Sequence, residues 1–431
     1  MSFRGKSIAL VLLLVVMLSG CLGGGAGKSG PKFNLEVYVS GQGSVNPKAG
    51  ATSIPSDTLV TIEAIPASGW EFSYWIGDVS DPYSPKTEIM MDEDKSVTAV
   101  MYSEEESIFF ETKDSSGAIV PGVSLMLTDS TGSVTTNSRG FAVVNTTAAS
   151  TIVTGVMDGF VVEPTPLVVQ KGDRISFTLS KGSVPRVFTA ELTINHTVFK
   201  DTAKLNPFSS AKIREAMNWL IDREYIVSSI YTDHSPLTTV VVPDTFEYEL
   251  MLDTIEALEQ KYSFDAAKAE AVIHAEMEQL GAELVGGIWH YKDEPVEVKF
   301  LIRDDEVRTK LGDYIADQLE NVGFAVERIY LNGGQAVPIW MNGDPTDGKW
   351  NLYTGGWMVS KNYLSHHLLK QFHTPGSLGR LGEAYTHNPE LIEVVDRLNG
   401  PFNSVEERKE VLKQSLELSL QDSVRVWLVY Q

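Results

Sequence analysis

The sequence predicts a multidomain protein in which two small all-β modules precede an α/β domain. The chain of 431 residues is too long for one ordinary hydrophobic core. Up to about residue 181, apolar and β-branched residues alternate with polar ones, and Gly- and Pro-rich turns separate the runs, as is typical of strands. Beyond about residue 185, helical periodicity alternates with short strand-like runs, which indicates α/β architecture.

The first twenty residues have the pattern of a secretion signal. Arg4 and Lys6 precede an apolar run over 8–18, which is too short to cross the roughly 30 Å hydrocarbon core of a bilayer as a helix. The four residues 18–21, Leu-Ser-Gly-Cys, resemble the lipobox of prokaryotic lipoproteins. This resemblance implies that residues 1–20 are a signal peptide removed before Cys21, whose thiol then carries a diacylglyceryl group.

The segment after the signal predicts a tether. Residues 21–31 are rich in Gly and Ser, so we expect a flexible spacer between the lipid and the first folded module. Cys21 is the only cysteine of the chain, which leaves no internal disulfide to form. Because two acyl chains anchor far better than one, we expect a protein held at the extracytoplasmic face of the cell membrane.

The composition excludes some classes of partner. A hydrophobic content of 43% is that of a globular protein, and the net charge is −22. Such acidity argues against nucleic acid as a partner, since there is no basic surface to displace the counterions of phosphates. It also argues against a polybasic membrane-binding face, so the charge is best interpreted as a contribution to solubility.

Residues 32–103 are expected to form the first all-β module. The run 69–78, Gly-Trp-Glu-Phe-Ser-Tyr-Trp-Ile-Gly-Asp, together with the segments on either side, resembles the divergent internalin-B-type repeat of bacterial and archaeal surface proteins. Trp70 and Trp75 could form a platform for a ligand, but tryptophans in a thin β module more often fill its core. The alternating runs that predict strands include 34–39 and 58–64.

Residues 104–181 are expected to form the second module. A Pro-Gly-Val strand over 120–129 leads to an acidic turn and then to Asn-Ser-Arg-Gly-Phe over 137–141. This pattern resembles the carboxypeptidase-regulatory-like β-sandwich, and the resemblance implies a spacer or docking unit without catalysis. Two sequons, at Asn145 and Asn195, are possible glycosylation sites in an exported chain.

The C-terminal half, residues 182–431, predicts alternating helices and strands. We expect helices over 211–231 and 265–281, a third that carries Leu311, Ile315 and Leu319 and ends at Gly323, and a fourth that starts at a capping box of Ser404 and Glu407. We expect strands over 296–301, 325–330, 350–353 and 424–430.

Five motifs in this half occur in a definite order. They are Pro-Phe followed by Lys-Ile-Arg-Glu-Ala-Met-Asn-Trp-Leu-Ile-Asp-Arg over 207–223, then 262–269, 316–327, 350–357, and 388–391 with 406–408. Together they resemble the oligopeptide- and dipeptide-binding proteins, the extracellular solute-binding components of ABC importers. The resemblance implies a type II periplasmic-binding-protein-like domain over about 187–431. Relative to the family this domain is incomplete, because the β modules stand where the N-terminal lobe is expected and the closing strands are missing.

The same resemblance implies a function and a site. It implies a non-catalytic protein that closes about a hinge on a peptide-type solute, delivers it to an ABC permease in the membrane, and needs no cofactor. Peptide-binding members carry an aspartate a few residues after a Gly-Trp pair, and Ser360 occupies that place here. Tyr353, Gly356, Trp357 and Ser360 are therefore the candidate ligand-binding residues, although Tyr353 and Trp357 could equally pack a hinge or a core.

Motifs of other chemistries are absent from the sequence or incomplete. Residues 343–349 match Gly-x4-Gly-Lys, but Trp350 follows and two aspartates lie within, so we expect a turn. Four histidines, His366, His367, His373 and His387, fall in one region that we expect to be solvated, without the carboxylate or cysteine spacing of a metal site. One alternative is a surface interaction or adhesion lipoprotein whose β modules bind partners and whose α/β domain no longer binds solute. A less favoured alternative is an exported hydrolase, which the missing Gly-x-Ser-x-Gly argues against.

Overall fold

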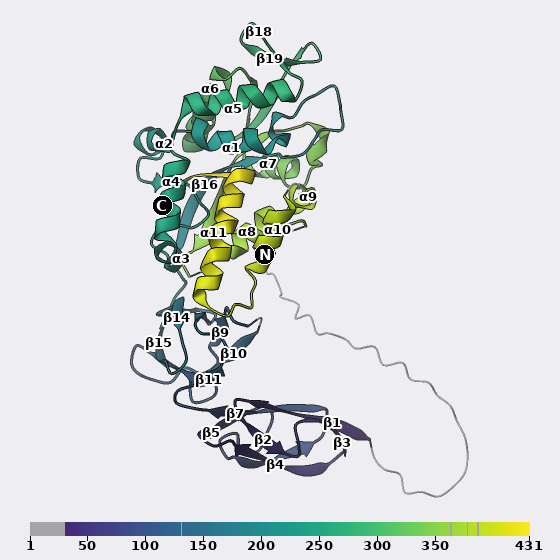
Figure 1. Cartoon of the computed structure of the whole chain (residues 1–431), viewed down its shortest axis with the longest axis vertical. Helices are drawn as coiled ribbons and strands as arrows, with labels where there is room; N and C mark the ends of the chain where they lie inside the picture. Colours follow the sequence, from purple (N-terminus) through teal and green to yellow (C-terminus); the bar gives the residue numbers. More distant parts are fainter. Residues whose placement is uncertain (1–30, 131, 363, 377, 386–387) are drawn as a thin grey trace, which may run out of the picture. The chain divides into compact units, whose positions relative to one another are not determined.

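The computed structural model describes residues 31–130, 132–362, 364–376, 378–385 and 388–431 (Figure 1). The chain forms two compact units that divide between Met101 and Tyr102. The predicted signal peptide, the lipobox with Cys21 and nearly all of the predicted spacer lie outside the described residues. Within the described part of the chain, no helix has the length and apolarity required to cross a membrane.

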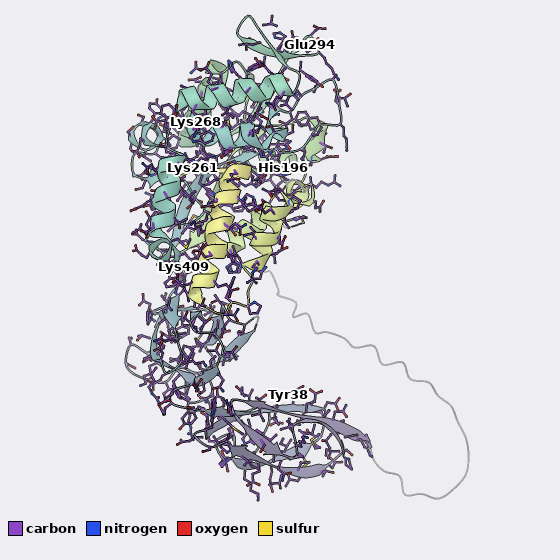
Figure 2. All side chains as sticks on the ribbon, in the orientation of Figure 1. Tyr38, His196, Lys261, Lys268, Glu294 and Lys409 are labelled. Atoms are coloured by element: carbon purple, nitrogen blue, oxygen red, sulfur yellow. The ribbon has the colours of Figure 1, made fainter. Side chains whose placement is uncertain are left out.

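The first unit is an all-β module in two sheets. Along β1, buried Leu35 and Val37 alternate with exposed Glu36 and Tyr38, and Tyr38 lies on the surface with half of its area exposed (Figure 2). Trp75 is buried and its Nε1 donates to the carbonyl of Ser84 at 3.0 Å, so it fills the core as expected. The sheet orders are β3-β1-β7-β5 and β2-β4-β6. The strands are β1 (Lys32–Ser40), β2 (Gly43–Asn46), β3 (Gly50–Pro55), β4 (Thr58–Pro66), β5 (Glu71–Ile76), β6 (Lys86–Met91) and β7 (Lys95–Tyr102).

The second unit begins with a β-sandwich. Two four-stranded sheets, β10-β9-β12-β14 and β11-β8-β15-β13, enclose a core in which Phe110 stacks on Phe177 at 5.9 Å between ring centroids. Two small all-β regions followed by an α/β domain are thus confirmed. The strands are β8 (Ser107–Asp114), β9 (Ser124–Leu127), β10 (Ser133–Thr135), β11 (Phe141–Asn145), β12 (Thr151–Val156), β13 (Phe160–Glu163), β14 (Leu167–Val169) and β15 (Arg174–Lys181).

The rest of the second unit is an α/β domain around a six-stranded mixed sheet. The strand order is β17-β24-β16-β23-β21-β22, and a three-stranded sheet β18-β19-β20 lies apart from it. β16 pairs antiparallel with both β23 and β24, whereas β21 runs parallel to β22 and β23. The strands are β16 (Arg186–Ile194), β17 (Ser235–Pro236), β18 (Glu283–Val285), β19 (Ile288–Tyr291), β20 (Glu294–Pro295), β21 (Glu297–Arg303), β22 (Ala325–Leu331), β23 (Leu352–Ser360) and β24 (Arg425–Tyr430).

Helices pack against this sheet and complete its core (Figure 1). Asp265 and Ser404 each accept a backbone N–H of the first helical turn, as expected, whereas Ser210, the cap expected for the helix that starts at Ala211, makes no side-chain capping bond. The helices are η1 (Pro207–Ser209), α1 (Ala211–Leu220), α2 (Arg223–Ser229), α3 (Phe246–Leu250), α4 (Leu252–Lys261), α5 (Ala266–Gln279), α6 (Glu306–Asn321), α7 (Gly333–Trp340), η2 (Pro345–Asp347), α8 (His366–His373), α9 (Gly379–Glu383), α10 (Pro389–Arg397) and α11 (Val405–Asp422).

Two expectations about the helices are wrong in detail. The single helix expected over 211–231 is divided, because Ile221 leaves the helical conformation and Asp222 starts α2 by accepting from the N–H of Tyr225. The capping box at Ser404 is half formed. Ser404 Oγ accepts from the N–H of Glu407, but the Glu407 carboxylate accepts from the N–H of Asn403 instead of that of Ser404.

The sandwich and the α/β domain are joined by hydrogen bonds between their main chains. The N–H of Ala149 donates to the carbonyl of Asn403 at 2.8 Å, and the N–H of Phe402 donates to the carbonyl of Thr128 at 3.0 Å. The N–H of Val405 donates to Ser150 Oγ at 3.1 Å. The boundary expected between 181 and 182 therefore lies inside one compact unit.

Candidate functional site

All four predicted ligand residues lie on β23, but they divide between its two faces. Successive side chains of a strand point to opposite faces. Tyr353 and Trp357 are therefore on one face, opposite Thr193 and Thr189 of β16. Gly356 and Ser360 belong to the other face. The structure thus does not bring the four residues together as one binding surface.

Tyr353 is a packing residue. Its ring stacks on Trp340 of α7 with 4.9 Å between centroids and 19° between planes, and 5% of the residue is exposed. Arg303 Nη1 donates to its hydroxyl at 3.4 Å. Of the two interpretations of Tyr353, the packing one matches this geometry.

Trp357 packs over a buried carboxylate that the sequence analysis missed. Its indole lies 5.2 Å from the ring of Phe372, and its Nε1 donates to Glu191 Oε1 at 3.3 Å. Thr193 Oγ1 donates to the same oxygen at 2.7 Å, and Arg425 Nε lies 3.8 Å from Oε2. Burial raises the pKa of Glu191, although Arg425 and the hydrogen bonds act in the opposite direction.

Glycine is required where β23 passes this carboxylate. A Cβ added at Gly355 would lie 1.9 Å from Glu191 Oε1, and one at Gly356 would lie 2.9 Å from the ring of Phe188. The first contact joins carbon to oxygen and the second joins carbon to carbon. Both are shorter than non-bonded atoms normally approach, so the neighbouring side chain would have to move. Gly356 therefore allows close strand packing, and no ligand contact is needed to explain its identity.

Replacing Gly355 by alanine is expected to lower the free energy of unfolding by about 1–3 kcal/mol, because the new methyl group must displace a buried carboxylate. Urea denaturation followed by far-ultraviolet circular dichroism measures the loss. The control is Gly334→Ala in α7, where the nearest atom is 3.4 Å away and alanine favours the helix by up to about 1 kcal/mol. Equal midpoints for the two variants would contradict the steric argument.

Ser360 is the predicted residue that reaches a cavity. It ends β23 opposite Arg186 and borders a cavity of about 720 Å³ between the sandwich and the α/β domain. Drug-sized ligands occupy pockets of about 300–1,000 Å³. The sandwich contributes 126–128, 130, 132–133, 154–160 and 162, and the segment that follows contributes 182–184 and 186. The α/β domain contributes Ser360, Asn362, Leu364, His366, His367, Leu398 and Asn399.

About half of the residues that line the cavity are polar, but large apolar side chains lie among them and most of the wall surface is apolar. Met126 and Val156 of the sandwich are 42% and 41% exposed, although both are large hydrophobic residues. Opposite them, Leu364 and Leu398 present apolar side chains from the α/β domain. A largely apolar wall surface with oriented polar groups is the usual character of a site for a small organic ligand.

His366 is the most unusual polar group of this cavity. Its Nδ1 is buried and accepts or donates no hydrogen bond within the described structure, and its ring centroid lies 4.0 Å from that of His367. Burial and the neighbouring His367 lower the pKa of His366 to about 4, so the ring is uncharged at neutral pH. An uncharged imidazole whose buried nitrogen lacks a partner can accept a hydrogen bond.

The expectation that the histidine region is solvated is wrong for His373, whereas His367 is exposed and His366 is half-buried. His373 is buried, with Nδ1 3.3 Å from Asp422 Oδ2, because α8 packs its inner face against α11. His387 lies outside the described residues. No group of three or more metal-binding side chains occurs among the residues described.

A buried ion pair holds the start of α8. Ser365 Oγ donates to Glu247 Oε2 at 2.5 Å, its N–H donates to the same oxygen, and Arg408 Nη2 donates to Oε1. The side chains of Glu247 and Arg408 are almost wholly buried. Burial alone would favour the protonated acid, but Arg408 and the bonds from Ser365 outweigh it and lower the pKa of Glu247.

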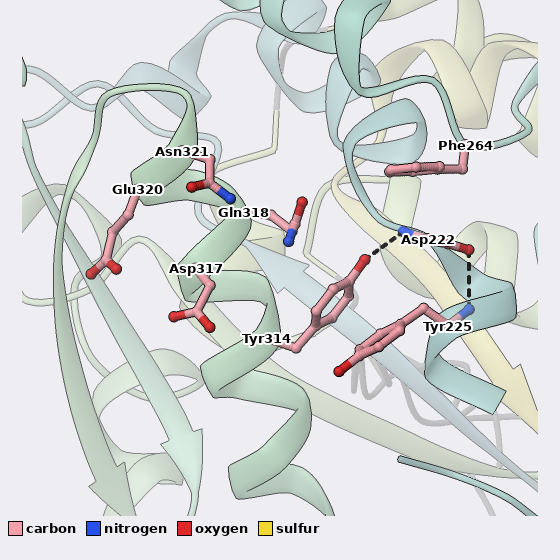
Figure 3. A pocket seen from close by; sticks show the side chains of 8 residues that line it. All are labelled: Asp222, Tyr225, Phe264, Tyr314, Asp317, Gln318, Glu320 and Asn321. Carbon is pink, nitrogen blue, oxygen red and sulfur yellow. Dashed lines mark hydrogen bonds between the residues drawn. The ribbon is translucent and has the colours of Figure 1, made fainter. Parts of the chain in front are cut away.

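A second pocket, of about 600 Å³, lies on the surface around α2 and α6 (Figure 3). Tyr225 and Tyr314 meet there at 4.7 Å, and the Tyr314 hydroxyl accepts from the N–H of Asp222 at 2.9 Å. Its carboxylates Asp317 and Glu320 are paired with Arg328. Because these charges already have partners, this pocket offers less to a solute than the apolar cavity does.

The two sequons differ in their surroundings. Asn145 is half-buried, and its Oδ1 accepts from Ser107 Oγ at 2.7 Å. Asn195 is fully buried, and its Nδ2 donates to the carbonyls of Pro345 and Trp350 at 2.8 and 2.9 Å. A glycan on that nitrogen would remove these bonds and need space that the core does not have, so the fold argues against modification at Asn195.

Comparison with known protein families decides the classification. The family model described as bacterial extracellular solute-binding proteins, family 5, middle, matches residues 141–376, which is more than half of the chain. The chain belongs to this family. The match begins in β11 of the sandwich, well before residue 187, and it includes Ser360 and His366. A second model, the divergent InlB B-repeat domain, matches residues 33–103.

Solved structures of oligopeptide-binding proteins are similar to part of the chain. The mannohexaose-bound periplasmic oligopeptide-binding protein of Thermotoga maritima is 19% identical, with a TM-score of 0.45. AppA of Bacillus subtilis, in complex with a nonapeptide, is 16% identical, with a TM-score of 0.44. The matches cover 57% of this chain but 46% and 45% of those chains, so the protein spans less than half of their length. No curated protein matches the chain.

Proposed function

We propose that the protein is a lipid-anchored, extracytoplasmic solute-binding component of an ABC importer, and that it binds its solute in the cavity between the sandwich and the α/β domain. Membership of the solute-binding family supports the class of function. The observation that carries the site is the apolar cavity of about 720 Å³ at the end of β23, where Ser360 lies.

In this proposal the sandwich acts as the second wall of the binding site. A family member needs two surfaces that enclose the solute, and here Met126 and Val156 face Leu364 and Leu398 across one cavity. Binding is non-covalent, and a hinge at the segment between β15 and β16 closes the walls on the ligand. Ser360 contacts the solute, whereas Tyr353, Gly356 and Trp357 support the strand that carries it.

The proposed ligands are peptides or similar small solutes, which an ABC permease then receives. Two of the similar solved proteins are described as oligopeptide-binding or contain a peptide, which supports this class. Calorimetry of the detergent-solubilised full-length lipoprotein with two pools, free peptides and peptides blocked at both ends, tests it. We expect heat and a tryptophan fluorescence change with at least one pool. If neither pool produces heat or a change in tryptophan fluorescence, the proposed solute binding is wrong.

The proposed anchor makes a separate prediction. Replacing Cys21 by serine removes the thiol that would take the lipid, so we expect the protein to move from the membrane fraction to the soluble extracytoplasmic fraction. Mass spectrometry of the parent protein is expected to show a diacylglyceryl group on Cys21. The control is Ser19→Ala, which retains a small residue before the cysteine and is expected to leave the protein in the membrane. An unmodified Cys21 would refute the anchor.

A second function is favoured by the first unit, whose repeat resembles those of surface proteins. Several large hydrophobic side chains of this unit are about half exposed, among them Tyr38, Leu59 and Ile76. Such side chains suit contact with a surface partner. An adhesion lipoprotein would bind cells or wall material through them. Loss of that binding on Tyr38→Ser and Leu59→Ser, with solute binding unchanged, would support this role.

A further inference from the structure

We propose that the cavity between the sandwich and the α/β domain takes an uncharged, largely apolar solute that donates a hydrogen bond to His366, in preference to a zwitterionic peptide. This inference rests on the proposed solute-binding function and names the class of ligand. Three features of the cavity lead to it: the apolar walls, the position of its charges and one buried nitrogen that lacks a partner within the described structure.

The apolar walls come from both sides of the cavity. Met126, Val156 and Phe160 line it from the sandwich, and Leu364 and Leu398 line it from the α/β domain. Leu364 and Leu398 are buried, whereas Met126 and Val156 expose about two fifths of their surface. Covering such surface removes it from water and contributes about 25 cal/mol for each Å² buried, so an apolar solute gains most from this site.

Among the described residues that line the cavity, the two charged ones, Asp158 and Arg186, are exposed to solvent. Glu247, which contacts Ser365 at the start of α8, is already paired with Arg408. The terminal ammonium and carboxylate of a free peptide would lose hydration inside such a site, and a buried charge without a partner is strongly unfavourable. The site therefore selects against zwitterions.

His366 supplies the polar contact. Its Nδ1 is buried and lacks a hydrogen-bond partner within the part of the chain that the structure describes. A buried polar atom in this state costs about 1–3 kcal/mol unless a ligand or a water satisfies it. Because the ring is uncharged at neutral pH, Nδ1 accepts a hydrogen bond when the proton is on Nε2. A ligand N–H or O–H completes that bond.

A fluorescent probe with these properties tests the proposal. N-Phenyl-1-naphthylamine is uncharged, apolar and carries a single N–H. We expect it to bind the full-length, detergent-solubilised protein, and N-acetyl-Leu-Phe-Leu amide to displace it at a concentration at least tenfold lower than free Leu-Phe-Leu does. Displacement by the free peptide at an equal or lower concentration overturns the proposed ligand class and leaves solute binding in place. If none of the three compounds binds, both the proposed ligand class and the proposed solute-binding function are wrong.

Matched variants locate the probe. Val156→Trp fills the cavity and is expected to weaken probe binding at least tenfold, whereas Val168→Trp, at an equally exposed valine of the same sheet outside the cavity, is expected to leave it unchanged. His366→Phe is expected to weaken the probe severalfold but not its N-methyl derivative, which has no N–H to donate. If Val156→Trp and Val168→Trp weaken probe binding equally, the probe does not bind in this cavity. If His366→Phe weakens the binding of the probe and of its N-methyl derivative equally, His366 does not accept the hydrogen bond of the probe.

Discussion

Replacing Asp422 by alanine is expected to lower the free energy of unfolding of the α/β domain by about 3–5 kcal/mol, because it leaves a buried guanidinium without its counter-ion. Arg214 Nη2 donates to Asp422 Oδ1 at 2.7 Å, and both side chains are essentially inaccessible to water. The Tyr385 hydroxyl donates to Oδ2 at 2.8 Å. The measurement is the urea midpoint followed by far-ultraviolet circular dichroism, which reports mainly on the helices.

An exposed ion pair provides the control for this prediction. Asp317→Ala removes a carboxylate that meets Arg328 at the surface, so the expected loss is below about 1 kcal/mol. If Asp422→Ala proved as mild as Asp317→Ala, the buried network would not be a stabilising element of the domain.

The Asp422 network also gives the stability a dependence on pH. Burial favours the protonated acid, but His373, Arg214 and Tyr385 together lower the pKa of Asp422 below its usual value of 3.8. A carboxyl whose pKa is lower in the folded chain stabilises the fold above its unfolded pKa, and this stabilisation is lost as the pH falls through the folded value. The parent domain should therefore lose stability in acid more steeply than Asp422→Ala does.

Local patterns allowed much of the fold to be predicted from the sequence. Asp265, Ser404 and the glycines that end the helices mark boundaries through interactions within a single turn, and the structure places α5 and α11 there. β16 was not predicted, although it is the centre of the sheet, because Thr189, Glu191 and Thr193 place polar groups on one buried face. Besides Thr193, the partners of the Glu191 carboxylate are Trp357 and Arg425, more than 150 residues away along the chain.

The candidate site was predictable only in part, again because contacts between residues far apart along the chain form it. The Gly-Trp motif located β23 and, by its spacing, Ser360 at the strand end. The facing wall, Met126 and Val156, belongs to a module that the sequence indicated as a spacer. Its place in the site depends on contacts such as Phe402 to Thr128, which no local pattern encodes. His373 looked solvated because its burial depends on the packing of α8 against α11.

The ion pair beneath α8 links the stability of the domain to the proposed site. Replacing Glu247 by alanine is expected to cost about 3–5 kcal/mol, because Arg408 Nη2 loses its acceptor while Nε and Nη1 have none among the described atoms. The same change removes the one carboxylate oxygen that accepts both the N–H and the Oγ hydrogen bond of Ser365, which precedes His366. We therefore expect Glu247→Ala to weaken probe binding in the cavity as well as to lower the urea midpoint.

Two further variants separate charge from packing at this pair. Glu247→Met combined with Arg408→Met removes both charges and keeps the volume, so the double variant is expected to be more stable than Glu247→Ala by several kcal/mol. Ser365→Ala keeps the ion pair and loses one hydrogen bond, with an expected cost of about 1 kcal/mol. If the double variant were as unstable as Glu247→Ala, an uncompensated charge could not be the cause. The role of Glu247 would then lie in orienting Ser365, and the defect in probe binding should be shared by Ser365→Ala.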